Sequence, residues 1–166
     1  MIAADPFVQY VESLANSGNR GALSALRQGF ANPMRALPYV APFLREEDGR
    51  QREDNLLLLG GLFGSFPEMG KVPLATALRS VMEQTESDSI ELRFRALLDS
   101  PREDLPNHLR HAVSLVRSVP IPIDYNDLLR AIRNWSHEDR FIQRAWARQF
   151  WSFDASSAEE KEQENS

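Results

Sequence analysis

Residues 140–151 read RFIQRAWARQFW, and their spacing is typical of a helix with two unlike faces. At about 100° per residue, one broad arc is mostly apolar and holds Phe141, Ile142, Ala145, Trp146, Gln149 and Phe150. The opposite arc holds Arg140, Arg144, Arg148 and Trp151. The stretch therefore predicts an amphipathic helix, with an inner face packed against a core and an outer face rich in arginine.

The same helical period recurs in almost every segment that precedes this stretch. Helices are expected from Pro6 past Leu14, from Asn19 to about Phe30, and near residues 50–66, 74–83, 88–98 and 125–134. Another helical element is expected to start near Ser100 and to bury a stripe that ends at Val116, and residues 31–44 are expected to hold a loop and a short helix. No run alternates over enough residues to indicate a strand. We therefore predict an all-α fold with about eight helices in two packed helical lobes. We expect the lobes to be residues 1–70 and 71–153, the second a helical bundle, although a division near residues 84–88 is an alternative, and we expect residues 154–166 to form a disordered acidic tail.

Several polar residues stand where helices begin. Asp5, Asn19 and Asp124 are predicted N-caps. Asp88 with Glu91 predicts a capping box, and Ser136 with Asp139 is expected to cap a last helix that runs to about Phe153.

Three glycines interrupt the apolar run of residues 56–64: Gly60, Gly61 and Gly64. No Lys-Ser or Lys-Thr pair follows them, so a phosphate-binding loop is not indicated. Close packing between helices explains them better.

The composition is that of a soluble globular protein, with 166 residues, 42% hydrophobic and 26% charged. The chain has no cysteine, which excludes disulfides and thiolate metal sites and favours a cytoplasmic location. The N-terminus lacks the pattern of a secretory signal. The longest apolar run, residues 56–63, is too short to cross a bilayer, so no membrane partner is expected.

Charge is segregated along the chain. The net charge of −5 argues against a nucleic-acid partner, but residues 154–166 alone carry −4. Residues 128–153 carry +3. The acidic tail either stays solvated or competes with nucleic acid for a basic surface.

Arginine supplies almost all of the positive charge, with seventeen Arg and two Lys. A planar guanidinium can bind phosphate through two parallel hydrogen bonds, whereas an ammonium acts as a point charge. Helical spacing places several arginines on shared outer faces: Arg20 with Arg27, Arg110 with Arg117, and Arg130 with Arg133. We expect these faces to converge, with Arg140, into one continuous positive strip.

Chemistry for catalysis is not indicated. His108 and His111 are three residues apart, but no third metal ligand is evident and a surface pair is favoured. The sequence contains no nucleophile, phosphate-loop or metal-protease motif. We therefore expect no enzymatic activity, no cofactor and no metal.

Five segments resemble the CasB family, the small subunit of the type I-E CRISPR surveillance complex Cascade. They are GNRGALSALRQGF (18–30), ALPYVAPFL (36–44), SIELRFRALLDSPREDLPNHLRHAVSLVRS (89–118), IPIDYNDLLRAIRNW (121–135) and FIQRAWARQFW (141–151). Together they cover most of the predicted folded chain, and their order and spacing are specific in combination.

The resemblance implies a two-lobed helical protein without catalysis, which steadies the R-loop through its basic surface. The implied partners are the guide-RNA-holding backbone subunits, the large subunit, a second copy of the chain, the target and displaced DNA strands, and the guide RNA as a further candidate. Arg27, Arg102, Arg110, Arg130 and Arg140 fall in segments where the family is basic. Gln28 stands where many members have a second basic residue.

The complete set of predicted nucleic-acid contacts is Arg20, Arg27, Arg102, Arg110, Arg117, Arg130, Arg133, Arg140 and Arg144. For Arg144, together with Arg148, a role in folding or subunit contact is an equal alternative. Two other functions stay open: a helical protein-protein adaptor without nucleic-acid contact, and a small helical hydrolase with a buried acid pair.

Overall fold

The computed structural model describes residues 4–152 and confirms the all-α fold class. The α-helices are α1 (Pro6–Asn16), α2 (Arg20–Gln28), α3 (Pro33–Val40), α4 (Arg50–Ser65), α5 (Leu74–Thr85), α6 (Asp88–Asp99), α7 (Leu105–Ser118), α8 (Tyr125–Arg133) and α9 (Phe141–Phe150). A 3₁₀ turn, η1 (Ala41–Phe43), and one short strand, β1 (Met69–Val72), complete the described elements. These nine α-helices compare with about eight expected from the sequence.

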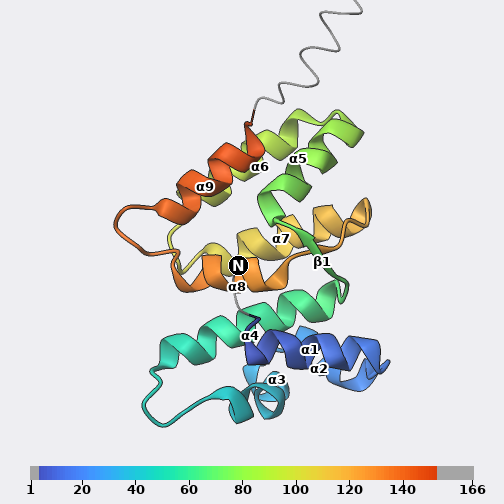
Figure 1. Ribbon diagram of the computed structural model, residues 1–166, viewed down its shortest axis with the longest axis vertical. Coiled ribbons are helices and arrows are strands. Elements are labelled where there is room, and N and C mark those ends of the chain that lie inside the picture. The colour runs from blue at the N-terminus through green and yellow to red at the C-terminus, as the bar shows by residue number, and fades with distance from the viewer. Residues whose placement is uncertain (1–3, 153–166) are drawn as a thin grey trace, which may run out of the picture.

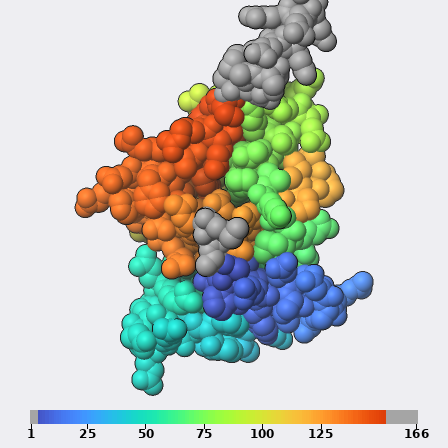
Figure 2. Space-filling view, in the orientation of Figure 1, coloured from blue at the N-terminus to red at the C-terminus, as the bar shows by residue number. Residues whose placement is uncertain are grey.

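The helices form two groups that follow chain order (Figure 1). Helices α1–α4 lie together at one end, α5–α9 lie at the other, and β1 runs between the groups. The space-filling view shows the two groups in direct contact (Figure 2). Because their buried side chains form one continuous cluster, the division into separate lobes at residue 70 stays a prediction. The predicted acidic tail lies outside the described residues.

Three of the predicted N-caps are confirmed. The Asp5 carboxylate accepts a hydrogen bond from the Phe7 N–H at 2.8 Å, with Pro6 at the first helical position. Asn19 accepts from the Ala22 N–H at 3.1 Å at the start of α2. Asp124 accepts from the Asp127 N–H at 3.0 Å at the start of α8.

Two other predicted caps are wrong, although α6 begins at Asp88 as expected. Ser87 is the N-cap of α6, so Asp88 and Glu91 both lie inside its first turn, and Glu91 instead pairs with Arg95 at 3.0 Å. The last helix begins at Phe141, after a left-handed Arg140, and ends at Phe150. The polar residues have the spacing of a capping motif, but Glu91 pairs with Arg95 and the N-cap position of α9 is occupied by Arg140.

The glycines of α4 allow close packing against its neighbours, as predicted. A Cβ on Gly64 would lie 2.6 Å from the Leu23 carbonyl oxygen and 3.0 Å from the Arg27 backbone nitrogen. A Cβ on Gly61 would lie 2.7 Å from the Phe30 ring. Helix α2 therefore lies almost backbone to backbone on α4, which fixes the position of Arg27.

Strand β1 was not predicted, because its four residues are too few to show alternation. Met69 and Val72 form isolated parallel bridges with Ile123, and the Asp124 N–H donates to the Val72 carbonyl at 2.9 Å. The buried Tyr125 hydroxyl donates to the Phe66 carbonyl. These contacts anchor the start of α8 to the end of α4 and so place residues 66–72 beside residues 122–125.

Across residues 4–152, no helix combines the length and apolar character that a membrane span requires.

Candidate nucleic-acid interface

Helix α2 presents Arg20 and Arg27 to solvent. Its opposite side buries Ala22 and Leu26, so the seven-residue spacing places both arginines on the outer face. Both side chains are exposed. Together with Leu23, Ser24, Gly64 and Ser65 they line a surface hollow of about 590 Å³.

Helix α7 presents Arg110 and Arg117 in the same way. Its inner stripe is Leu105, Leu109, Ala112, Val113 and Val116, all buried. The predicted outer face is confirmed, with His111 and Ser114 between the two arginines along a second hollow of about 390 Å³.

These two hollows adjoin, since Ser65 and Arg117 line both. We call the surface formed by Arg20, Arg27, Arg110 and Arg117 the α2/α7 arginine surface. The end of α4 lies between its two halves, because α4 packs on both α2 and α7. Residues 20–27 and 110–117, which are far apart in the sequence, therefore lie side by side here.

The four guanidiniums of this surface form no ion pair with any residue in the described part of the chain. Arg110 lies over the Phe30 ring at 4.4 Å, and Phe30 itself packs against Gly61. This cation–π contact orients Arg110 and leaves its N–H groups available. One exposed acid, Glu68, lies at the edge of the hollow that Arg20 and Arg27 line, called here the α2 hollow.

Arg130 and Arg133 are not part of this surface. Both line a separate hollow near the N-terminus, together with Asp5 and Asn126. Arg133 pairs with the Asp5 carboxylate at 3.8 Å, and Arg130 lies 5.6 Å from the Phe141 ring centroid.

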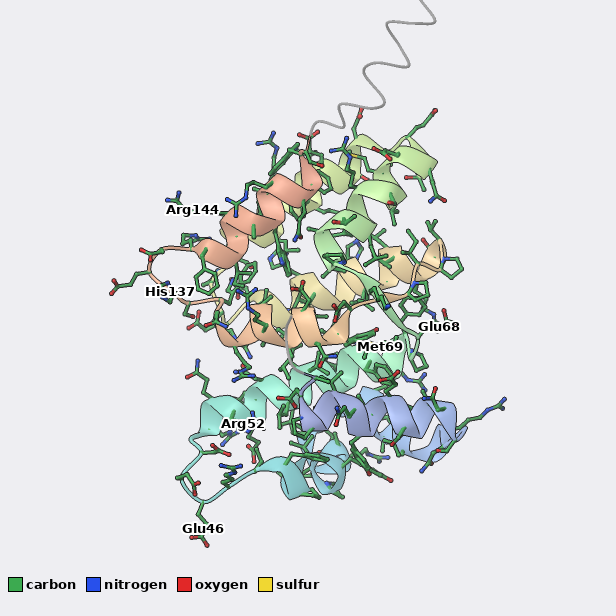
Figure 3. The ribbon with its side chains drawn as sticks, in the orientation of Figure 1. Glu46, Arg52, Glu68, Met69, His137 and Arg144 are labelled. Carbon is green, nitrogen blue, oxygen red and sulfur yellow. The ribbon has the colours of Figure 1, made fainter. Side chains whose placement is uncertain are left out.

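Arg140 and Arg144 lie at the start of α9, and both make hydrogen bonds to main-chain carbonyls. The Arg140 guanidinium donates to Leu98, and Arg144 Nε donates to Asp139 at 3.0 Å. Figure 3 shows Arg144 on the opposite side of the molecule from Glu68, which marks the edge of the α2 hollow. The expectation of one continuous strip that includes Arg130 and Arg140 is therefore wrong: α8 and α9 carry their arginines to other surfaces.

Arg102 occupies the junction between the two groups of helices. Its Nη2 donates to the buried Asn55 Oδ1 of α4 at 2.7 Å, and its own Nε is buried without a hydrogen-bond partner among the described residues. Burial lowers the pKa of Arg102. This environment is that of a structural tie rather than a surface contact.

The structure adds Arg93 as a candidate. Arg95, two residues later, pairs with Glu91 and lies 5.0 Å from the Trp151 ring, so it is already occupied. Arg93 points the other way, toward His111. The differing directions of Arg93 and Arg95 were predictable from helical spacing, but the choice between them required the position of α7.

Trp151 is less available for contact with a ligand than its position on the arginine-rich face of the last helix suggested. The residue is 40% exposed, its Nε1 donates to Glu91 Oε1 at 3.2 Å, and its ring makes T-shaped contacts with Phe94 and Phe150. Gln143, which no pattern singled out, is buried and donates to the Trp135 carbonyl at 2.8 Å.

Two basic groups lie near His111: Arg93 from α6 and His108 from its own helix. Partial burial lowers the pKa of His111, and the charges of Arg93 and His108 lower it further. Among residues 4–152 no three potential metal-binding side chains of the His, Asp or Glu type cluster together.

Fold and surface together describe an all-α protein with an arginine face built from two helices, whose guanidiniums pair with no acid among residues 4–152. The chain belongs to the CRISPR-associated protein Cse2 family, whose sequence model matches residues 22–151. A curated Cse2 protein of Thermus thermophilus is 34% identical over 147 residues, which cover 86% of this chain and 85% of the relative.

Several solved structures share the fold, and two of them are compared with this chain. The CasB crystal structure from Thermus thermophilus superposes with a TM-score of 0.74 at 31% identity, covering 90% of this chain and 100% of that one. A chain of a CRISPR RNA-guided surveillance complex gives a TM-score of 0.73 at 22% identity, covering 87% and 88%. The resemblance to the CasB family is thus confirmed.

Proposed function

We propose that the chain is a non-catalytic small subunit of a CRISPR RNA-guided surveillance complex, which contacts nucleic-acid backbone and stabilises the R-loop in antiviral defence. The observation that carries this proposal is the α2/α7 arginine surface, with four exposed guanidiniums that no described acid pairs. Support for the complex comes from the family and from the surveillance-complex chain that shares the fold.

The physical role follows from the energetics of strand exchange. The guide–target duplex is about as stable as the DNA duplex that it replaces, so protein contacts to phosphate can tip the balance. Guanidiniums bind phosphate regardless of base, which suits a subunit that must work on every target. The partners would be the backbone and large subunits, a second copy, and the target and displaced strands.

The test is a double charge reversal, Arg27→Glu with Arg110→Glu, in a reconstituted complex. R-loop lifetime would be measured by single-molecule or filter-binding assay at two salt concentrations. We expect the complex to assemble and the R-loop to dissociate faster, with a weaker dependence on salt, because fewer phosphates are neutralised.

A matched control is Arg45→Glu with Arg148→Glu, which changes the net charge equally at exposed positions outside the arginine surface. Equal R-loop lifetimes for both double variants would contradict the proposal. A variant that fails to assemble while its isolated fold is intact would instead favour the adaptor function, in which the arginines bind a protein partner.

A further inference from the structure

A cavity of about 200 Å³ opens between α6 and α7, beside the arginine surface. Its floor is apolar and is formed by Leu78, Ile90, Phe94, Leu97, Ala112 and Leu115. Its rim is polar, with Arg93 on the α6 side and Asn107, His108 and His111 on the α7 side. None of these rim side chains makes a hydrogen bond or ion pair with another described residue.

The cavity is continuous with the α2/α7 arginine surface. Asn107 and His111 line both this cavity and the hollow that holds Arg110 and Arg117. A polynucleotide backbone held by those two arginines would therefore pass the mouth of the cavity.

We propose that this cavity receives one unstacked nucleobase of a single strand whose backbone lies on the arginine surface. The proposal rests on the proposed function and adds a second component, a base contact, to the phosphate contacts. The base would rest on the apolar floor, while Asn107, His108 and His111 offer hydrogen bonds to its edge and Arg93 faces the adjoining phosphate.

Size and charge favour this occupant. Drug-sized ligands occupy pockets of about 300–1,000 Å³, so a cavity of about 200 Å³ suits one ring system rather than a whole nucleotide. No acidic side chain from the described residues lines it, so its rim attracts an anion. An aliphatic side chain of a protein partner would contact the apolar floor but would leave the basic groups of the rim without an anionic partner. Single-strand binding proteins commonly combine a cationic track with contacts to individual bases.

The test compares two ligands for the full chain: a ten-residue single strand of thymidylate, and the same strand with every base replaced by an abasic sugar. Both carry the same phosphates, so the ratio of their dissociation constants isolates the contribution of bases. By fluorescence anisotropy at low salt, we expect the base-containing strand to bind at least threefold more tightly.

The cavity is then closed with Ala96→Phe, because Ala96 lies at its α6 wall and is exposed. We expect the ratio to fall to about one while the affinity for the abasic strand stays unchanged. Leu92→Phe is the matched control: Leu92 lies one turn earlier on α6, is 69% exposed and is outside the cavity, so its ratio should equal that of the wild type.

In the wild type, the imidazole NMR signals of His108 and His111 should shift with the thymidylate strand and much less with the abasic strand. This measurement keeps the proposal testable should Ala96→Phe disturb the fold. Equal binding of the two strands, or an unchanged ratio in a folded Ala96→Phe variant, would overturn the cavity proposal and leave the proposed function standing. If neither strand binds, the proposed function fails and the cavity proposal fails with it.

Discussion

Burial distinguishes Arg102 from the arginines of the α2/α7 surface. Changing Arg102 to Gln removes the hydrogen bond to Asn55 Oδ1, an oxygen that the fold has taken out of water. We expect a loss of about 1–3 kcal/mol in the free energy of unfolding, measured by urea denaturation.

The control is Arg117→Gln, which is exposed and should leave stability within about 0.5 kcal/mol of the wild type. In nucleic-acid binding the two variants should behave in the reverse order: Arg117→Gln weakens binding, and folded Arg102→Gln does not. Weaker binding by Arg102→Gln alone would restore it as a contact residue.

His111 makes binding sensitive to pH. Partial burial and the charges of Arg93 and His108 lower the pKa of His111 in the folded chain, so its imidazole binds a proton only at a lower pH than it does in the unfolded chain. A bound phosphate favours the protonated form, and affinity for a single strand should therefore rise as the pH falls through the His111 pKa.

The measurement is the dissociation constant between pH 7.5 and 5.5 at constant ionic strength. His111→Gln should flatten the profile, whereas His137→Gln should keep it, because His137 contacts Phe141 and Asp139 rather than the arginine surface. A profile that stays steep in His111→Gln would assign the effect to another group. Free of ligand, the same lowered pKa means that the fold loses stability as the pH drops through this window, since the unfolded chain binds the proton more tightly.

At the scale of elements, the contact between α2 and α4 depends on a glycine. Gly64→Ala would place a methyl group 2.6 Å from a backbone oxygen, which cannot move as a side-chain end could. Although alanine favours helix by about 1 kcal/mol, we expect net destabilisation of about 1–3 kcal/mol in thermal or urea unfolding.

Gly21→Ala in α2 is the comparison, because the nearest atom to its added Cβ is 3.9 Å away. This variant should be neutral or more stable by up to about 1 kcal/mol. If Gly64→Ala were equally stable, the close approach that positions Arg27 would not be required.

For the whole molecule, the arginine surface sets the salt dependence. With about four phosphates neutralised, the logarithm of the affinity for a single strand should fall against the logarithm of salt with a slope near −3, at about −0.7 per phosphate. Arg20→Gln should reduce the slope by about 0.7, as should Arg117→Gln. Arg148→Gln, outside this surface, should not change it; equal effects from all three would point to general attraction rather than a defined site.

Local sequence patterns predicted some features of this molecule and missed others. Helical period predicted where Arg20, Arg27, Arg110 and Arg117 face outward, since that depends on neighbours three and four residues away. The caps of α6 and α9 were predicted wrongly. Glu91 pairs with Arg95 of its own helix and accepts from Trp151, and Arg140 donates to the Leu98 carbonyl of α6. Strand β1 was missed because its pairing with Ile123 lies some fifty residues downstream.

The amino-acid sequence alone determined the helical class, the caps at Asp5, Asn19 and Asp124, the outward arginine faces and the likeness to the CasB family, because each of these is written in spacing and order along the chain. Tertiary structure decided which faces join. Helix α2 meets the α7 face across the glycine-lined end of α4. Helices α8 and α9 carry their arginines to other surfaces, and Arg102 is half-buried against Asn55. The reason is physical: the orientation of a side chain follows from local backbone geometry, but the convergence of charges depends on how helices distant in sequence pack on one core.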